Sequence, residues 1–161
     1  MKFYTVSDRY ITYLKTLDHK VPNNYGGKRP YVGIIIEING HKYLAPMTSY
    51  KPKQDAFDTN NRTIFKIHEK GKPLKKLGML HLNNMIPVLD SEVTEVDFST
   101  QDLKYKILLT HQINFIKSEQ DAIKERAAKL YESVVHLKNS HFCKLSCDFL
   151  VLEAGYRNFV A

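Results

Sequence analysis

Two hydroxyl groups and an ammonium group stand close together in the sequence at Thr48, Ser49 and Lys51. They follow Pro46, which has no N–H to donate to a strand ladder, so we expect the strand to end there and these side chains to lie on its exit loop. Hydroxyls beside a cation suit the oxygens of a phosphate. The stretch therefore predicts a phosphate-binding site, although a Thr-Ser pair after a strand is also common turn or helix-cap chemistry.

A hairpin is expected to position this group. Residues 31–38 and 41–47 are apolar runs joined by Asn39-Gly40, a pair that can take positive φ at both central turn positions. Further strands are expected at residues 2–6, 63–68 and 78–82, with a short edge piece at 85–88. Ser7 is expected to cap a first helix, and from residue 101 onward the apolar period becomes helical, including a helix over 121–137. Strands first and long helices later predict an α+β fold.

Length and composition limit the class of protein. The 161 residues, 43% of them hydrophobic and 25% charged, predict a single globular domain over residues 1–161. No uninterrupted apolar run, such as Ile34–Ile36, comes near the length needed to span a membrane, and no signal peptide is evident. We therefore expect a cytoplasmic protein without a membrane partner. The seven histidines are scattered and show no metal-ligand spacing, so neither a metal site nor another cofactor is expected.

The charge is distributed unevenly along the chain. Residues 1–80 carry 15 Lys and Arg against 6 Asp and Glu, a net charge of +9, while residues 81–161 carry 9 against 11, a net charge of −2. A basic half suggests a polyanionic partner docking on one side. Tyrosines in the same half offer aromatic faces, which suit the unstacked bases of single-stranded RNA; they include Tyr10, Tyr13, Tyr25, Tyr31, Tyr43 and Tyr50. A lysine-rich solvated surface is the alternative interpretation.

Several separated blocks resemble one family. They are Met1-Lys-Phe-Tyr-Thr-Val-Ser7, Gly40-His-Lys-Tyr-Leu-Ala-Pro-Met-Thr-Ser49, Leu77-Gly-Met-Leu-His-Leu-Asn-Asn-Met-Ile-Pro87 and Leu152-Glu-Ala-Gly-Tyr-Arg157. In this order they resemble the ToxN/AbiQ family, the endoribonuclease toxins of type III toxin–antitoxin systems, whose antitoxin is an RNA. The resemblance implies a compact, strongly bent antiparallel sheet with peripheral helices, similar to the Kid/MazF toxins.

The resemblance also implies roles for particular residues. Thr48, Ser49 and Lys51 fall on positions that the family uses as active-site residues. Tyr25 and Arg29 fall where the family has a functional Tyr and a Lys. Arg29 departs from that pattern, since a guanidinium holds phosphate well but is a poor proton donor, and Lys28 can serve instead. His41 lies within the strongest block. The residues expected to bind RNA are Tyr25, Lys28, Arg29, His41 and Lys53. For His41 and His81, each in a predicted strand or at its edge, the residues alone favour a structural role.

RNA cleavage without a metal ion needs few protein groups. The 2′-OH of the substrate attacks the adjacent phosphorus, so the protein supplies a base, an acid and donors for the non-bridging oxygens. This predicts an endoribonuclease that leaves 2′,3′-cyclic phosphate and 5′-OH ends. The family resemblance further implies two kinds of partner, cellular RNA substrates and a short, structured, repeat-derived antitoxin RNA. It also implies that the toxin cuts this antitoxin RNA and is inhibited by it in a ring of alternating protein and RNA. A non-catalytic RNA-binding module is the alternative.

Overall fold

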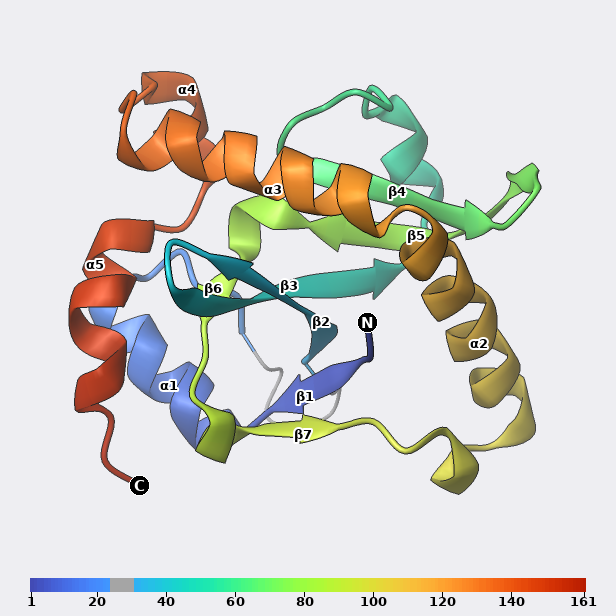
Figure 1. Ribbon diagram of the computed structural model, residues 1–161, viewed down its shortest axis with the longest axis horizontal. Helices are drawn as coiled ribbons and strands as arrows, with labels where there is room; N and C mark the ends of the chain where they lie inside the picture. The colour runs from blue at the N-terminus through green and yellow to red at the C-terminus, as the bar shows by residue number, and fades with distance from the viewer. Residues whose placement is uncertain (24–30) are drawn as a thin grey trace.

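The computed structural model describes residues 1–23 and 31–161, and their arrangement is the α+β fold that the sequence predicts (Figure 1). Seven described strands form one antiparallel, bent sheet in the order β4-β5-β3-β2-β1-β7, with β6 also paired to β3. Their bounds are β1 Tyr4–Val6, β2 Val32–Ile38, β3 His41–Ser49, β4 Ile64–Glu69, β5 Lys72–His81, β6 Ile86–Pro87 and β7 Val93–Glu95.

Strand β3 changes its partner along its length. From His41 to Pro46 it pairs with β2 across the Asn39-Gly40 turn, where both turn residues have positive φ as predicted. From Met47 to Ser49 it pairs with β5 instead. The prediction of an exit loop after Pro46 was therefore wrong, because a second strand takes over the ladder beyond the proline. Thr48 and Ser49 lie within β3, and only Lys51 lies beyond its end.

Strand β5 begins earlier than predicted. Its first five residues, Lys72 to Lys76, are exposed, so no apolar alternation marks them in the sequence. They pair with β4 in the hairpin that projects from the body of the molecule in Figure 1, where the register shifts around His68. The buried part of β5 begins at Leu77 and runs to the cavity described below.

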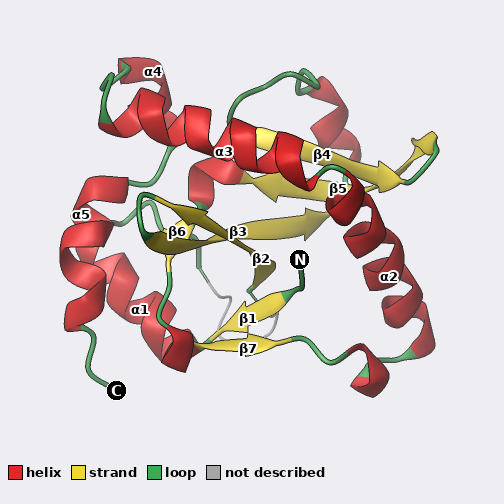
Figure 2. Ribbon diagram, in the orientation of Figure 1, coloured by secondary structure: helices red, strands yellow, loops and turns green. Residues whose placement is uncertain are grey.

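Helices surround the sheet (Figure 2). They are α1 Asp8–Leu17, α2 Leu103–Ser118, α3 Gln120–Val135, α4 Ser140–Leu145 and α5 Phe149–Gly155. Their apolar faces cover the sheet and bury side chains such as Leu14, Ile116, Leu130 and Leu152, which are each 0% exposed. Helix α2 contacts β4 and β5, which fixes one of its faces beside the end of β3. Short 3₁₀ turns, η2 Pro52–Ala56 and η3 Leu82–Asn84, follow β3 and β5.

The residues at the N-cap positions of the helices use their side chains in two different ways. Asp102 and Asn139 cap α2 and α4, and their side-chain oxygens accept from the backbone N–H groups of Tyr105 and Phe142. Ser7 occupies the predicted N-cap position of α1 but makes no cap hydrogen bond, because its hydroxyl donates to Glu92 Oε1 at 2.7 Å instead. Glu92 is only 3% exposed and needs this partner.

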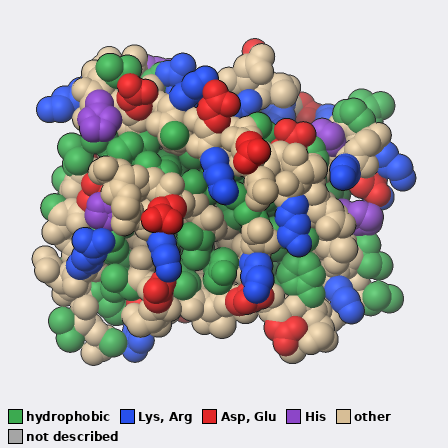
Figure 3. Space-filling model, in the orientation of Figure 1, with side chains coloured by type: hydrophobic (Ala, Val, Ile, Leu, Met, Phe, Trp, Pro, Cys, Tyr) green, Lys and Arg blue, Asp and Glu red, His purple; other side chains and the backbone are tan. Residues whose placement is uncertain are grey.

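The fold mixes the two differently charged halves of the chain. Lys2 pairs with Glu95, Arg9 with Glu92 and Lys42 with Asp90, each across more than 40 residues. On the face shown in Figure 3, basic and acidic side chains lie interspersed among hydrophobic and other side chains. Carboxylates of the second half thus neutralise part of the net +9 of residues 1–80. No helix in the described part of the chain is long and apolar enough to cross a membrane.

Candidate active site

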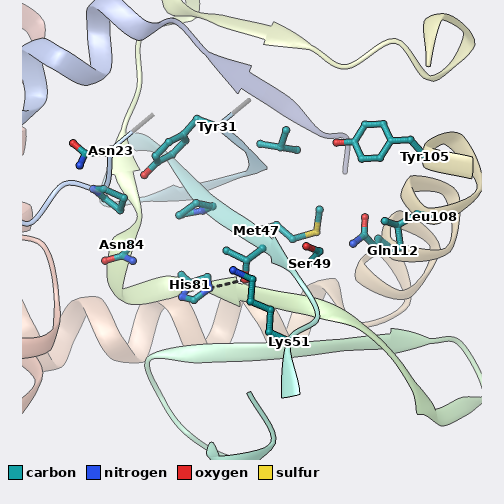
Figure 4. Close-up of a pocket in the computed structure, with 14 residues that line it drawn as sticks. Asn23, Tyr31, Met47, Ser49, Lys51, His81, Asn84, Tyr105, Leu108 and Gln112 are labelled. Atoms are coloured by element: carbon teal, nitrogen blue, oxygen red, sulfur yellow. Dashed lines mark hydrogen bonds between the residues drawn. The ribbon is translucent and has the colours of Figure 1, made fainter. Parts of the chain in front are cut away.

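A cavity of about 440 Å³ opens beside the end of β3 (Figure 4). Thr48, Ser49 and Lys51 all line it, so the structure brings together the three residues that the sequence singles out. Helix α2, the turn η3, the end of β5 and residues 22–23 and 31–32 supply the other walls. These walls include Asn23, Tyr31, His81, Asn84, Tyr105, Leu108 and Gln112.

The Thr48 hydroxyl is held by two side chains. Its Oγ1 lies 2.9 Å from Nε2 of His81, and it accepts a hydrogen bond from Nε2 of Gln54 at 3.2 Å. Gln54 belongs to η2, is only 5% exposed, and also donates to the Ser49 backbone carbonyl at 3.1 Å. Since Gln54 already donates to Oγ1, the Thr48 hydroxyl hydrogen is free to point toward His81. One lone pair of Oγ1 remains for a ligand.

His81 is the residue that sequence reasoning missed. The sequence favours a structural role for it, but it ends β5 and its ring lines the cavity next to Thr48. Burial, with a contribution from the charge of Lys53, lowers the pKa of His81 below its ordinary value of 6.5. The imidazole is therefore neutral at pH 7, so Nε2 can accept a proton. The only signal in the sequence was its place in the block Leu77–Pro87 of the family resemblance.

Gly78 allows β5 to run close to β3 at this point. A Cβ atom on this residue would lie 2.2 Å from the backbone oxygen of Thr48, and its φ of +152° disfavours other residues. Gly78 pairs with Ser49 in the ladder. The glycine therefore lets the backbone of β5 pack against the two hydroxyl-bearing residues and holds them at the cavity wall.

Lys51 supplies the positive charge of the cavity. Its backbone carbonyl accepts from the N–H of Gln54 at 2.9 Å, and Figure 4 shows its side chain extending toward the Thr48–His81 pair. No ion pair to Lys51 forms among residues 1–23 and 31–161. Lys53 is exposed and lies near enough to His81 to affect its pKa. Tyr25, Lys28 and Arg29, the other predicted RNA-binding residues besides His41, fall outside the described residues.

The structure does not bring His41 to this cavity. His41 begins β3 at the opposite end from Ser49, and its Nδ1 lies 2.8 Å from the Tyr156 hydroxyl. Its Nε2 lies 3.8 Å from a carboxylate oxygen of Glu153. These contacts suit a structural histidine, and its RNA-binding role stays a prediction. Within the described ranges, no three His, Cys, Asp or Glu side chains form a group suited to a metal ion.

Comparison with known proteins shows which chains resemble this one. A family model described as "Toxin ToxN, type III toxin-antitoxin system" matches residues 2–157. The chain is 39% identical to the endoribonuclease ToxN of Pectobacterium atrosepticum, over 99% of this chain and 94% of that protein. It is 34% identical to the endoribonuclease AbiQ of Lactococcus lactis subsp. lactis, over 96% of this chain and 86% of that protein.

Solved structures show the same similarity. One, described as "A processed non-coding RNA regulates a bacterial antiviral system", superposes with a TM-score of 0.90 at 38% identity and covers 100% of both chains. Another comes from work on "selective toxin inhibition by a non-coding RNA pseudoknot" and superposes with a TM-score of 0.82 at 34% identity, over 98% of this chain and 96% of that chain. The bent sheet and its helices thus form a fold already seen in toxins that RNA regulates.

Proposed function

The chain belongs to the ToxN family of type III toxin–antitoxin toxins, and we propose that it is an endoribonuclease whose active site is the cavity at the end of β3. One observation carries the proposal. Two hydroxyls, an ammonium group and a neutral imidazole line the same cavity, with Thr48 Oγ1 only 2.9 Å from His81 Nε2. These are the donors and the proton acceptor that transfer of a phosphodiester to a neighbouring 2′-OH requires.

The reaction that we propose uses no nucleophile from the protein. The 2′-oxygen of the nucleotide before the cut attacks its own 3′-phosphorus, a new O–P bond forms, and the bond from phosphorus to the 5′-oxygen of the next nucleotide breaks. The products are a 2′,3′-cyclic phosphate and a 5′-OH. The 2′-OH loses a proton and the departing 5′-oxygen gains one, and no resident metal ion takes part.

Thr48 and His81 take the first proton in this scheme. The 2′-OH donates to the remaining lone pair of Thr48 Oγ1, and the threonine hydroxyl donates in turn to the neutral Nε2 of His81. A proton can move along these two hydrogen bonds as the 2′-oxygen attacks. Gln54 keeps Thr48 in the orientation that this transfer requires, since it donates to Oγ1 from a buried position.

Ser49 and Lys51 act on the phosphate. The pentacoordinate phosphorane carries more negative charge on its non-bridging oxygens than the ground state does, so an ammonium and a hydroxyl at those oxygens stabilise the transition state preferentially. Lys51 carries the ammonium, and it can also protonate the departing 5′-oxygen. Because Lys51 lies beyond the end of β3, its side chain can reach both the non-bridging oxygens and the departing 5′-oxygen.

Two substrates test the chemistry. An RNA that the enzyme cuts is synthesised again with a single 2′-deoxynucleotide immediately before the cut, and both are treated with the protein in the presence of EDTA. We expect the all-ribose RNA to be cut and its downstream product to accept a label from polynucleotide kinase without prior phosphatase treatment. We expect the deoxy substrate to stay intact at that bond. Cutting of the deoxy substrate, or loss of cutting in EDTA, would contradict this mechanism.

We further propose that a short, structured RNA antitoxin is both a substrate and an inhibitor. After its repeats are cut, the processed end stays in the cavity as a bound product and blocks other RNAs. Successive toxins and RNAs then close into a ring. Purification with the antitoxin gene present should yield a discrete short RNA and a particle several times the 18.7 kDa of one chain. Affinity should fall steeply with salt, because bound phosphates release counterions. A protein-only particle would contradict this assembly.

A further inference from the structure

Helix α2 presents an unusual set of side chains to the cavity. Tyr105, Leu108 and Gln112 are spaced i, i+3 and i+7, so they share one face of the helix, and all three line the cavity. In Figure 4 they lie together on one side of Ser49, while Tyr31, Asn84 and His81 lie on the other side. An aromatic ring, an apolar side chain and an amide are the groups with which proteins hold an unstacked nucleobase.

Only the nitrogen of the Gln112 side-chain amide has a hydrogen-bond partner among the described residues. Its Nε2 donates to the backbone carbonyl of Leu77 at 2.9 Å, whereas its Oε1 is buried and has no hydrogen-bond partner among the described residues. Gln112 is only 1% exposed. A buried acceptor without a partner is rare in a folded protein, because burial removes it from water and nothing replaces the lost hydrogen bond.

The orientation of this amide is set by its neighbour. Turning it over would place Oε1 against the Leu77 carbonyl, and two acceptors cannot form a hydrogen bond. Leu77 precedes Gly78, which pairs with Ser49, so the same short piece of β5 anchors both Gln112 and the catalytic strand. Oε1 is therefore held in place beside the phosphate site as a pure acceptor.

We propose that the Tyr105–Leu108–Gln112 face of α2 is a base-binding subsite for a nucleotide next to the cut, and that Gln112 Oε1 accepts from an exocyclic amino group of that base. The proposal rests on the function proposed above. Adenine and cytosine present such a group, N6 or N4, at one end of their Watson–Crick edge. Guanine presents O6 and uracil presents O4 at that position, and either oxygen would face Oε1 as a second acceptor. The subsite therefore selects adenine or cytosine at this position over guanine and uracil.

Substrate and enzyme variants together test this contact. Once the cut is mapped, RNAs are made in which adenosine or cytidine at each nucleotide flanking it is replaced by purine riboside or 2-pyrimidinone riboside, which lack only the amino group. For the wild-type protein we expect kcat/KM to fall about tenfold to a hundredfold at one flanking position. For Gln112→Met, which has no amide oxygen, we expect the paired substrates to be cut within about twofold of each other.

The controls separate the subsite from the reaction. Gln112→Glu keeps an acceptor and, with its buried carboxyl protonated so that it donates to the Leu77 carbonyl, should keep the preference for the amino-bearing base. Equal cutting of all paired substrates by the wild-type protein overturns the subsite, and this arm needs no variant to fold. A preference that is the same in Gln112→Met also overturns it. In both cases continued cleavage leaves the proposed function standing, since only base selection has failed.

Discussion

At its first residues β3 joins a closed hydrogen-bond network, and at its last residues it borders an open cavity. In the network, Glu153 Oε1 accepts from the hydroxyls of Tyr43 at 2.7 Å and Tyr131 at 2.5 Å. The amide of Asn39 donates to the Tyr131 hydroxyl, and His41 is bonded to Tyr156. Burial raises the pKa of Tyr131 to about 12 and that of Tyr43 well above its ordinary value, so both phenols stay protonated donors.

The cavity end is arranged differently. Gln112 Oε1 and the Tyr31 hydroxyl are buried there without a partner among the described residues, and Lys51 has no counter-ion within the same ranges. Both ends carry a histidine, tyrosines and polar side chains, so composition does not separate them. The two ends differ in whether their polar groups have hydrogen-bond partners. Polar groups that bond to one another stabilise the fold, whereas groups without a partner at a cavity are available to a ligand.

The strongest test of this comparison replaces polar side chains at the two ends of β3 with alanine. We expect Ser49→Ala and Lys51→Ala each to lower the RNA cleavage rate by about a hundredfold to a thousandfold, because each removes a donor to the transition state. Lys42→Ala is the matched control for Lys51→Ala, since Lys42 lies in β3 at the network end and is paired with Asp90. Rates are measured on equal amounts of folded protein. Cleavage retained by both cavity variants would move the active site elsewhere.

A second test removes the centre of the network. Glu153→Leu leaves the hydroxyls of Tyr43 and Tyr131 without their acceptor, so we expect the free energy of unfolding to fall by about 2–3 kcal/mol. Urea denaturation measures this change. Cleavage per folded molecule should be unaffected. Glu125→Ala on α3, which removes only an exposed pair with Lys129, should cost no more than about 0.5 kcal/mol. Lost cleavage in folded Glu153→Leu would remove the distinction between the two ends.

The pH dependence gives a third test. Burial and the charge of Lys53 lower the pKa of His81, so His81 is neutral at pH 7 and gains its proton only below its ordinary value of 6.5. We expect the cleavage rate to be constant between that value and neutral pH and to fall about tenfold per pH unit below the lowered pKa. His81→Gln should lower the rate and abolish this acid limb. The exposed His141, changed to Gln, should keep the limb. An unchanged limb in His81→Gln would assign it to another group.

The smallest effect is expected at His41. Glutamine in its place keeps a hydrogen-bonding side chain, so we expect His41→Gln to change the free energy of unfolding by about 1 kcal/mol or less. Its RNA affinity and cleavage rate should match those of the wild-type protein. Filter binding at fixed salt measures the affinity. A folded variant that binds RNA several times more weakly would restore the predicted RNA-binding role of His41 and extend the RNA path to the network end of β3.

Local pattern predicted much of the fold. The Asn39-Gly40 turn, the two strands that it joins and the helices after residue 101 appear close to their expected bounds, because turn chemistry and apolar periodicity act over a few residues. The prediction of an exit loop after Pro46 was wrong because Thr48 and Ser49 pair with β5, about 30 residues further along the chain. No local signal at Pro46 reveals that a second strand continues the ladder.

The candidate site divides in the same way. Thr48, Ser49 and Lys51 are neighbours in the sequence, so their residue types and spacing were enough to single them out. His81 and Gln112 come from separate elements and meet these residues only because β5 pairs with β3 and α2 packs on β4 and β5. Sequence by itself therefore determined the fold class and one wall of the cavity. Tertiary structure decided that His81 lies next to Thr48 with a lowered pKa and that the Gln112 amide oxygen has no partner among the described residues. The physical reason is that burial and hydrogen-bond partners depend on distant segments.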